Sequence, residues 1–205
     1  MPLILLVHGM GRSPLSMWRL ARALRKEGHA VELFGYVAAV ESIDSIVLKL
    51  TARMQTMAGG DYVVIGHSLG GVLLRMAIGK LDKTVTRPQR LIMLGSPNHS
   101  PRLARTFAHA LWFRALNGDA GRLLADEARL MRIPPVDCPC TIIAGTRGIR
   151  GRWSPFHDEA NDGIVAVTET ELAGNVEQFT VPAMHPFLMN NGEAREIIEK
   201  RCRGE

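Results

Sequence analysis

Short apolar runs alternate along the chain with longer segments of helical spacing. The short runs are typical of strands buried on both faces of a sheet. They occupy residues 3–7, 29–35, 62–65, 90–94, 140–144 and 176–181. Between them, apolar residues recur every three or four positions, which predicts helices at 13–28, 42–57, 72–81, 101–131 and 193–202. The alternation predicts an α/β fold with a mostly parallel sheet of about six strands and helices on both faces.

Local signals indicate where the first helix begins and which side of it faces the core. Ser13 is expected to cap its N-terminus, and a proline at position 14 suits the first turn. Gly28 ends the helix. The core-facing side is expected to consist of Leu15, Trp18, Leu20 and Leu24.

The composition is that of an ordinary globular domain. The chain has 205 residues, of which 46% are apolar and 22% charged, and this excludes disordered, collagen-like and coiled-coil proteins. No repeat, low-complexity tract or linker divides the sequence, so residues 1–205 are expected to form a single domain. The arginine-rich helical stretch 99–131 is the one candidate for a small cap within it.

The charge pattern bears on partners. The net charge is +5, and arginines gather in the stretches 19–25 and 147–152. Solvated surface explains such clusters most simply, while a basic patch that makes peripheral contact with membrane phosphates stays open. The sequence has no zinc-finger spacing and no aromatic residues interleaved for stacking, so no nucleic acid partner is expected. No apolar run approaches the roughly 20 residues of a membrane-spanning helix.

The cysteines bear on the compartment. Three cysteines cannot form a closed disulfide framework, and Cys138 and Cys140 are too close in sequence for an easy disulfide. Reduced thiols indicate a reducing compartment. The apolar start of the chain lacks the basic residues and cleavage site of a signal peptide, so a cytoplasmic location is expected.

The strongest chemical signal is the sequence Gly-His-Ser-Leu-Gly at positions 66–70. A buried strand leads into it and a helix follows it, which predicts a sharp turn that exposes the Ser68 hydroxyl at the sheet edge. Such a hydroxyl needs a general base to become a nucleophile. Among seven histidines, His185 follows the last strand and returns to the carboxyl edge of the sheet, so it is the predicted base; His67 is expected to point away from the serine.

The base needs a carboxylate to fix its tautomer. Asp162 is the predicted acid, because it precedes a glycine that permits a sharp turn, with Asp158 and Glu159 as alternatives. The order Ser68, Asp162, His185 is the order expected for this kind of fold. The oxyanion hole is expected to use the amides of Leu69, which follows the serine, and Met10, in the loop after the first strand.

Five segments together resemble the α/β-hydrolase superfamily, and within it the lipase-like branch. They are VHGMG, GHSLGG, LGSPNHS, NDGIV and MHPFLM, in the order of the family and along almost the whole chain. The chain also resembles bacterial relatives of GPI inositol-deacylase and small esterases, which share the NDG segment and the late histidine. The absence of preceding antiparallel strands is similar to the minimal six-stranded bacterial lipases, so a minimal α/β-hydrolase fold is expected.

The resemblance implies a serine hydrolase of carboxylic esters that acts on a small-molecule acyl ester or lipid through an acyl-enzyme. It implies no cofactor, and no metal, because Phe187 stands where large lipases of this type carry a calcium-binding aspartate. Leu111, Trp112 and Phe113 are expected to line an acyl pocket, although packing of a helix on the core explains the same pattern. The alternatives are a thioesterase or acyltransferase with the same triad, or a non-catalytic binding protein of this fold. The oligomeric state stays open.

Overall fold

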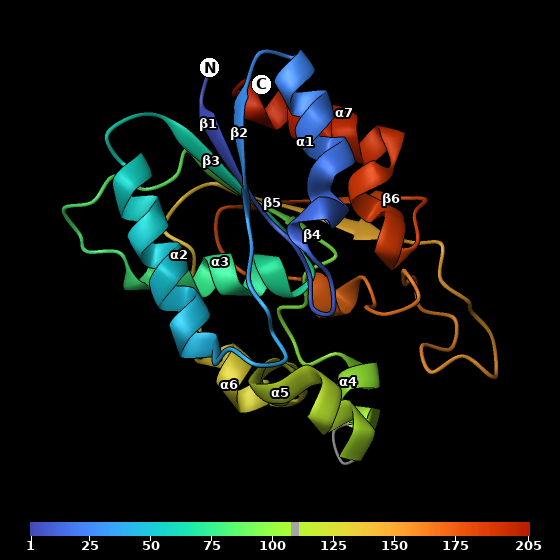
Figure 1. Cartoon of the computed structure of the whole chain (residues 1–205). Helices are drawn as coiled ribbons and strands as arrows, with labels where there is room; N and C mark the ends of the chain where they lie inside the picture. Colours follow the sequence, from blue (N-terminus) through green and yellow to red (C-terminus); the bar gives the residue numbers. More distant parts are fainter. Residues whose placement is uncertain (108–110) are drawn as a thin grey trace.

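A computed structural model of the chain describes the backbone of residues 1–107 and 111–205. Side chains are described for residues 1–106 and 118–205. Its centre is one sheet of six parallel strands in the order β2-β1-β3-β4-β5-β6 (Figure 1). The strands are β1 (Leu3–Val7), β2 (Ala30–Phe34), β3 (Tyr62–His67), β4 (Arg90–Leu94), β5 (Cys140–Gly145) and β6 (Val176–Val181). The prediction of a six-stranded, mostly parallel sheet is confirmed, and every pairing within this sheet is parallel.

Helices connect the strands as the periodicity predicts. They are α1 (Trp18–Lys26), α2 (Ile43–Met57), α3 (Leu69–Lys80), α4 (Arg102–Phe107), α5 (Leu111–Ala125), α6 (Glu127–Met131) and α7 (Gly192–Cys202). Short 3₁₀ helices cover Pro14–Met17, Thr168–Thr170 and His185–Asn190. The stretch 101–131, predicted as helical, contains the three helices α4, α5 and α6. Within α5 the backbone leaves helical geometry at Gly118, where φ is +53°.

The helices cover both faces of the sheet, as predicted. One core cluster packs α2 and α3 on the sheet and includes buried residues of α5 and α6. The second packs α1 and α7 on the opposite face. Figure 1 shows α1 beside α7, with α2 and α3 on the other side of the strands. All side chains of β3 are buried, as are all those of β5, which explains why these strands appear in the sequence as continuous apolar runs.

The predicted inner face of the first helix is partly wrong. Leu20 and Leu24 are fully buried, but Leu15 is 75% exposed and Trp18 is 46% exposed. The segment begins with a 3₁₀ turn, which has three residues per turn, so the helical phase is set only afterwards. Met17 therefore takes the buried position at the start of the face.

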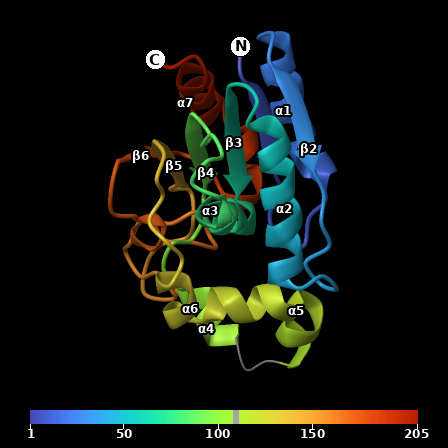
Figure 2. The same ribbon diagram turned by 90° about the vertical axis from the view of Figure 1, so that its left-hand side faces the viewer.

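The strands point their carboxyl ends toward the layer formed by α4, α5 and α6 (Figure 2). Asp119 ties this layer to the body of the protein, because its Oδ2 accepts a hydrogen bond of 3.1 Å from the amide of Ile43. Gly118 lies against the carbonyl of Ala39, so a side chain there would crowd the backbone. In the part of the chain that the structure describes, no helix has the length and apolar character needed to cross a bilayer.

Candidate active site

Ser68 occupies a strained turn between β3 and α3. Its backbone has φ 52° and ψ −123°, a region that residues with a side chain rarely adopt, at a cost on the order of 1–3 kcal/mol. The amide of Ser68 donates a 2.8 Å hydrogen bond to the carbonyl of Leu94 at the end of β4. The turn therefore lifts the serine above the carboxyl edge while the neighbouring strand holds its backbone.

Three glycines let this turn pack without steric conflict. A Cβ on Gly66 would overlap the backbone of Gly71, and a Cβ on Gly70 would overlap the carbonyl oxygens of residues 7 and 8. A Cβ on Gly71 would overlap the hydroxyl of Ser96. The close approach of α3 to β1, β3 and β4 therefore requires glycine at all three positions.

Asp162 and His185 form a buried acid–histidine pair. Asp162 is 1% exposed and His185 is 7% exposed. The ring Nδ1 of His185 lies 2.6 Å from Asp162 Oδ2, and the amide of His185 donates a 2.9 Å bond to the carbonyl of Asp162. With the proton on Nδ1 donated to the carboxylate, Nε2 of His185 is the nitrogen able to accept a proton.

A tight turn fixes the Asp162 carboxylate. Its Oδ1 accepts hydrogen bonds of 2.9 Å from the amide of Ile164 and 2.8 Å from the amide of Val165. The side chain of Asn161 accepts from the amide of Gly163, whose φ of 97° is the positive value that the sequence pattern anticipated. Oδ2 is thereby directed at the histidine, which explains the Asn-Asp-Gly sequence in physical terms.

The two alternative carboxylates lie elsewhere. Glu159 binds Arg102 and the hydroxyl of Thr168. Asp158 is exposed. Among the three acids considered from the sequence, Asp162 is the one in contact with His185.

Contacts through β4 bring the serine turn and the acid–histidine pair to one edge of the sheet. A Cβ on Gly95 would stand 3.0 Å from Asp162 Oδ2 and 3.1 Å from His185 Nδ1. Gly95 directly follows the residue whose carbonyl binds the Ser68 amide. No hydrogen bond joins the hydroxyl of Ser68 to His185, two residues that the structure describes in full. Such bonds are often long without substrate and tighten in the reactive complex.

The loop after β1 is held by an aromatic clamp that sequence reasoning missed. The ring of Tyr36 stacks on His8 with centroids 4.2 Å apart, and its hydroxyl donates a 2.8 Å bond to the carbonyl of His8. Gly9 follows, and a Cβ there would stand 3.1 Å from the Cβ of Ser68. Met10, one of the two predicted oxyanion donors, therefore belongs to a loop that touches the serine turn. The only sequence signal for Tyr36 is its place just after a strand that neighbours β1.

Leu69, the other predicted donor, is the first residue of α3. The amides of a first helical turn have no intrahelical acceptor, and the helix dipole favours negative charge there. Leu69 thus directly follows Ser68, and Met10 directly follows Gly9, the residue that lies against the serine turn.

His67 does not simply point away from the site. Its ring lies 4.8 Å from the ring of His185, and its Nε2 lies 3.0 Å from the carbonyl oxygen of His185. Burial lowers the pKa of His67 well below its ordinary value, and the positive charges of neighbouring groups add to this. A neutral His67 ring can therefore donate to that carbonyl and support the backbone that carries His185.

The predicted acyl-pocket residues Leu111, Trp112 and Phe113 have side chains outside the described residues. A groove of about 470 Å³ is lined in part by Met10, Arg12 and Tyr36. Met10 is a predicted oxyanion donor, whereas Ser68, Asp162 and His185 do not line the groove. The groove therefore reaches the loop after β1, which touches the serine turn.

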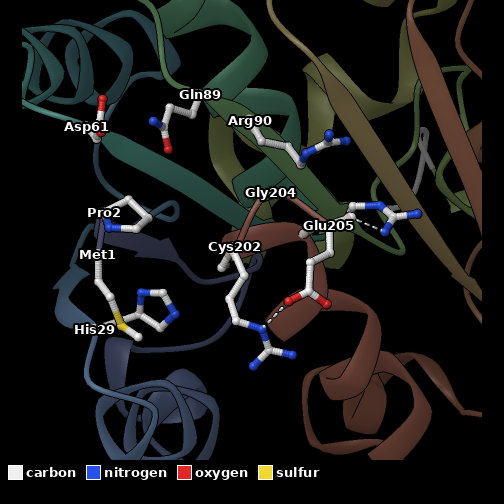
Figure 3. Close-up of a pocket in the computed structure, with 11 residues that line it drawn as sticks. Met1, Pro2, His29, Asp61, Gln89, Arg90, Cys202, Gly204 and Glu205 are labelled. Atoms are coloured by element: carbon white, nitrogen blue, oxygen red, sulfur yellow. Dashed lines mark hydrogen bonds and ion pairs between the residues drawn. The ribbon is translucent and has the colours of Figure 1, made fainter.

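A larger pocket, of about 740 Å³, lies at the opposite end of the sheet (Figure 3). It is lined by His29, Asp61 and Arg90 and by residues of the last turn of the chain, among them Cys202 and Glu205. None of the predicted catalytic residues lines it.

A sequence model described as the alpha/beta hydrolase family matches residues 4–189. No curated protein sequence matches the chain. Residues 4–189 include all three members of the predicted triad and all of the sheet except Leu3, the first residue of β1.

Several solved structures share the fold at low sequence identity. The mature lipase BlEst2 of Bacillus licheniformis has a TM-score of 0.72 and 19% identity, over 98% of this chain and 91% of that one. A carboxylesterase of Nitrososphaera gargenis has a TM-score of 0.61 and 15% identity, over 98% and 90%. The RedJ thioesterase of the prodiginine pathway in Streptomyces coelicolor has a TM-score of 0.60 and 18% identity, over 98% and 84%.

Proposed function

Because this chain belongs to the alpha/beta hydrolase family, we propose that it is a serine hydrolase of carboxylic esters, of esterase or lipase type. The observation that carries the proposal is the 2.6 Å bond of His185 Nδ1 to Asp162 Oδ2, at the edge where Ser68 stands in its strained turn. A buried carboxylate that orients an imidazole beside a partly exposed serine is the arrangement that activates a serine nucleophile.

In the proposed reaction, Ser68 attacks the ester carbonyl while Nε2 of His185 takes the hydroxyl proton. Asp162 holds the ring and stabilises the imidazolium that forms. His185 then protonates the departing alcohol, and the acyl group stays on the serine oxygen. Water, deprotonated by His185, attacks the acyl-enzyme, and the acid leaves as the hydroxyl of Ser68 is restored. The mechanism uses no cofactor and no metal.

The amides of Leu69 and Met10 are proposed to hold the oxyanion of each tetrahedral intermediate. One such donor is worth about 10²- to 10³-fold in rate in enzymes of this kind. The Tyr36 clamp supports this assignment, because it holds the carbonyl of His8, two residues before Met10. Tyr36 is thus a positioning residue in this proposal.

Substrate contacts are proposed at two places. The first is the groove lined by Met10, a proposed oxyanion donor. The second is the layer of α4, α5 and α6, which lies over the carboxyl ends of the strands. We propose that stretch 99–131 is a small cap whose residues Leu111, Trp112 and Phe113 contact the acyl chain of a small-molecule ester or lipid.

The same machinery serves a thioesterase or an acyltransferase, and the fold similarity to the RedJ thioesterase favours this as the second candidate. The two differ in the leaving group, thiol or alcohol, and in whether water or another alcohol accepts the acyl group. Rates on p-nitrophenyl esters of increasing chain length, compared with acyl-coenzyme A thioesters, separate them.

A reducing compartment, and hence a cytoplasmic location, is part of the proposal. Three free cysteines, Cys138, Cys140 and Cys202, are all buried, and burial raises the pKa of each thiol to about 12. Thiols held in the protonated form react slowly, which suits structural rather than redox roles.

The test is labelling with a fluorophosphonate, which phosphonylates activated serines, followed by peptide mass spectrometry. We expect rapid modification of Ser68 in the wild type and slow or no modification in His185→Ala. An exposed histidine outside the proposed triad, replaced as His157→Ala, is the matched control and should label like the wild type. A folded wild-type protein without an adduct contradicts the hydrolase and supports the non-catalytic binding protein.

A further inference from the structure

The seven-residue stretch Arg147–Trp153, in the segment that follows β5, is a surface feature that the proposed reaction does not use. We name it the arginine–tryptophan loop. Trp153 is 92% exposed and Ile149 is 81% exposed, the largest values among the tryptophans and isoleucines described. Arg147, Arg150 and Arg152 are exposed beside them. Placing two large apolar side chains in water forfeits the stabilisation that burial would give.

The charge of this loop is uncompensated. None of its three arginines forms an ion pair with a carboxylate anywhere in residues 1–107 or 111–205, and no acidic residue occurs between 147 and 157. The guanidinium of Arg152 lies 5.5 Å from the ring centre of Trp153, a cation–π distance. The loop therefore presents positive charge and an aromatic ring side by side.

The loop is held in shape by its own hydrogen bonds. The hydroxyl of Ser154 donates a 2.7 Å bond to the carbonyl of Ile149, and the amide of Gly151 donates a 2.8 Å bond to the carbonyl of His157. Phe156, three residues after Trp153, is 2% exposed, and its side chain anchors the segment that follows the loop in the protein interior. The hydrogen-bonded backbone around Trp153 and the buried side chain of Phe156 therefore hold Trp153 at the surface.

The base of the loop is joined to the acid–histidine pair. The amide of Arg147 donates a 3.1 Å bond to the carbonyl of Ala183, two residues before the catalytic histidine of the proposal. The amide of Gly148 donates a 2.7 Å bond to the carbonyl of Asn161, directly before the acid. A side chain at Gly148 would overlap Asn161, so the loop and the acid turn are packed without space between them.

Further exposed apolar side chains lie next to this pair. Ile164 is 44% exposed, Met184 46% and Phe187 60%. They stand two residues after the acid and on either side of the histidine. The arginine–tryptophan loop and these three side chains thus belong to the same edge of the protein.

We propose that the arginine–tryptophan loop docks this protein on an anionic lipid bilayer. Tryptophan and isoleucine side chains on a fixed loop enter the headgroup region, where indole rings are favoured. Arginines around them bind lipid phosphates, each with about 1 kcal/mol of attraction to an anionic surface. A single-stranded nucleic acid fits less well, since only one ring is available for stacking.

Docking by this loop turns the acid–histidine edge toward the lipid. Lipid esters then reach Ser68 from the bilayer, a consequence that rests on the proposed function. Binding itself needs no reaction, so it is measured in a Ser68→Ala protein, and its failure is distinct from failure of the hydrolase.

The test is flotation of Ser68→Ala protein with two vesicle preparations, phosphatidylcholine alone and equal parts of phosphatidylcholine and phosphatidylglycerol. We expect binding to the mixed vesicles and little to phosphatidylcholine. Adding both Arg150→Gln and Trp153→Ala to the Ser68→Ala protein should weaken its binding to the mixed vesicles roughly tenfold. Loss of one arginine accounts for about 1 kcal/mol, and loss of apolar contact by Trp153 accounts for the rest. Circular dichroism checks that each variant is folded.

A matched control exists in α1. Arg22 lies over the ring of Trp18 at 5.7 Å, the same chemistry on a different element, so Trp18→Ala with Arg22→Gln should leave binding within about twofold. Equal loss in both pairs overturns the proposal, because net charge rather than this loop then drives binding. Equal binding to both vesicles, or binding to single-stranded RNA but to neither vesicle, overturns it as well.

A second measurement does not depend on altering the loop. The chain has three tryptophans, so Trp18→Phe with Trp112→Phe leaves Trp153 as the single indole. Its emission should shift to shorter wavelength on addition of the mixed vesicles, since the ring leaves water. An unchanged spectrum at vesicle concentrations that bind the protein places the contact elsewhere and overturns the proposal.

Discussion

The two ends of the sheet differ in a way that separates empty space from reactive chemistry. The amino end has the larger pocket, about 740 Å³, but two of the arginines that line it share one ion-pair partner: Arg90 lies 3.4 Å and Arg201 2.5 Å from the carboxylate of Glu177. The carboxyl end has a smaller groove of about 470 Å³, lined in part by Met10 and Tyr36, and it also has a strained serine and a buried acid–histidine pair. Strain and convergent polar groups, rather than volume, distinguish the candidate active site.

The largest effect should come from Asp162→Asn. The amide oxygen can keep the bonds to the turn, but the amide nitrogen then faces Nδ1 of His185, so the ring no longer holds its proton there. We expect kcat for ester hydrolysis to fall on the order of 10⁴-fold with the fold intact. Asp61→Asn, at the amino end, should leave kcat unchanged. Equal losses in the two variants contradict the distinction between the ends.

Packing at the two ends should differ by several kilocalories per mole. Gly66→Ala puts a methyl group into the backbone of α3, whereas Gly59, near the amino end of β3, has no neighbour within 4 Å of the added Cβ. We expect Gly66→Ala to lower the unfolding free energy by about 3 kcal/mol and Gly59→Ala to change it by less than about 0.5 kcal/mol. Urea denaturation measures both variants. An unchanged unfolding free energy in Gly66→Ala contradicts the tight packing of the turn between β3 and α3.

Acid should destabilise the protein through the buried histidines of the carboxyl end. Burial lowers the pKa of His67 and of His8 below their ordinary value of 6.5, so the unfolded chain takes up protons that the folded chain refuses. Their contribution to the unfolding free energy is complete above about pH 6.5 and is lost as the pH falls toward the lowered pKa of each ring. For a histidine that stays neutral in the folded protein, the loss approaches about 1.4 kcal/mol per pH unit. His67→Gln should make the unfolding free energy less steep between pH 6.5 and 5, and an unaltered slope argues against a neutral His67.

The smallest expected effect is on kcat, and it distinguishes two tyrosines at opposite ends of the sheet. Tyr36 donates to the carbonyl of His8 at the carboxyl end, and Tyr62 donates to the carbonyl of Thr86 at the other. Replacing either by Phe removes one hydrogen bond and should cost about 1 kcal/mol of stability. Only Tyr36→Phe should lower kcat, by roughly tenfold with little change in KM, because the oxyanion loop loses its clamp. Steady-state kinetics on a soluble ester separates the two, and equal kinetics means that Tyr36 is merely structural.

Much of the fold could be predicted because the central strands are buried on both faces. The first and last residues of β1 and β4 agree with the ends of the apolar runs. The start of α3 is three residues earlier than the periodicity indicated, because the turn at Ser68 leads directly into the helix. The inner face of α1 was mispredicted because a 3₁₀ turn, invisible in the hydrophobic pattern, sets the helical phase.

The sequence by itself determined the alternation of strands and helices, the glycine-flanked serine and the order of serine, acid and histidine, since these depend on local periodicity and on positions where only glycine fits. Tertiary structure alone decided which carboxylate meets His185, because Asp158, Glu159 and Asp162 are close in sequence and differ only in direction. It also decided the contacts of Tyr36 and His67. Those contacts join residues 28 and 118 positions apart, and a pairing across such distances depends on how the strands are ordered in the sheet, which no local pattern encodes.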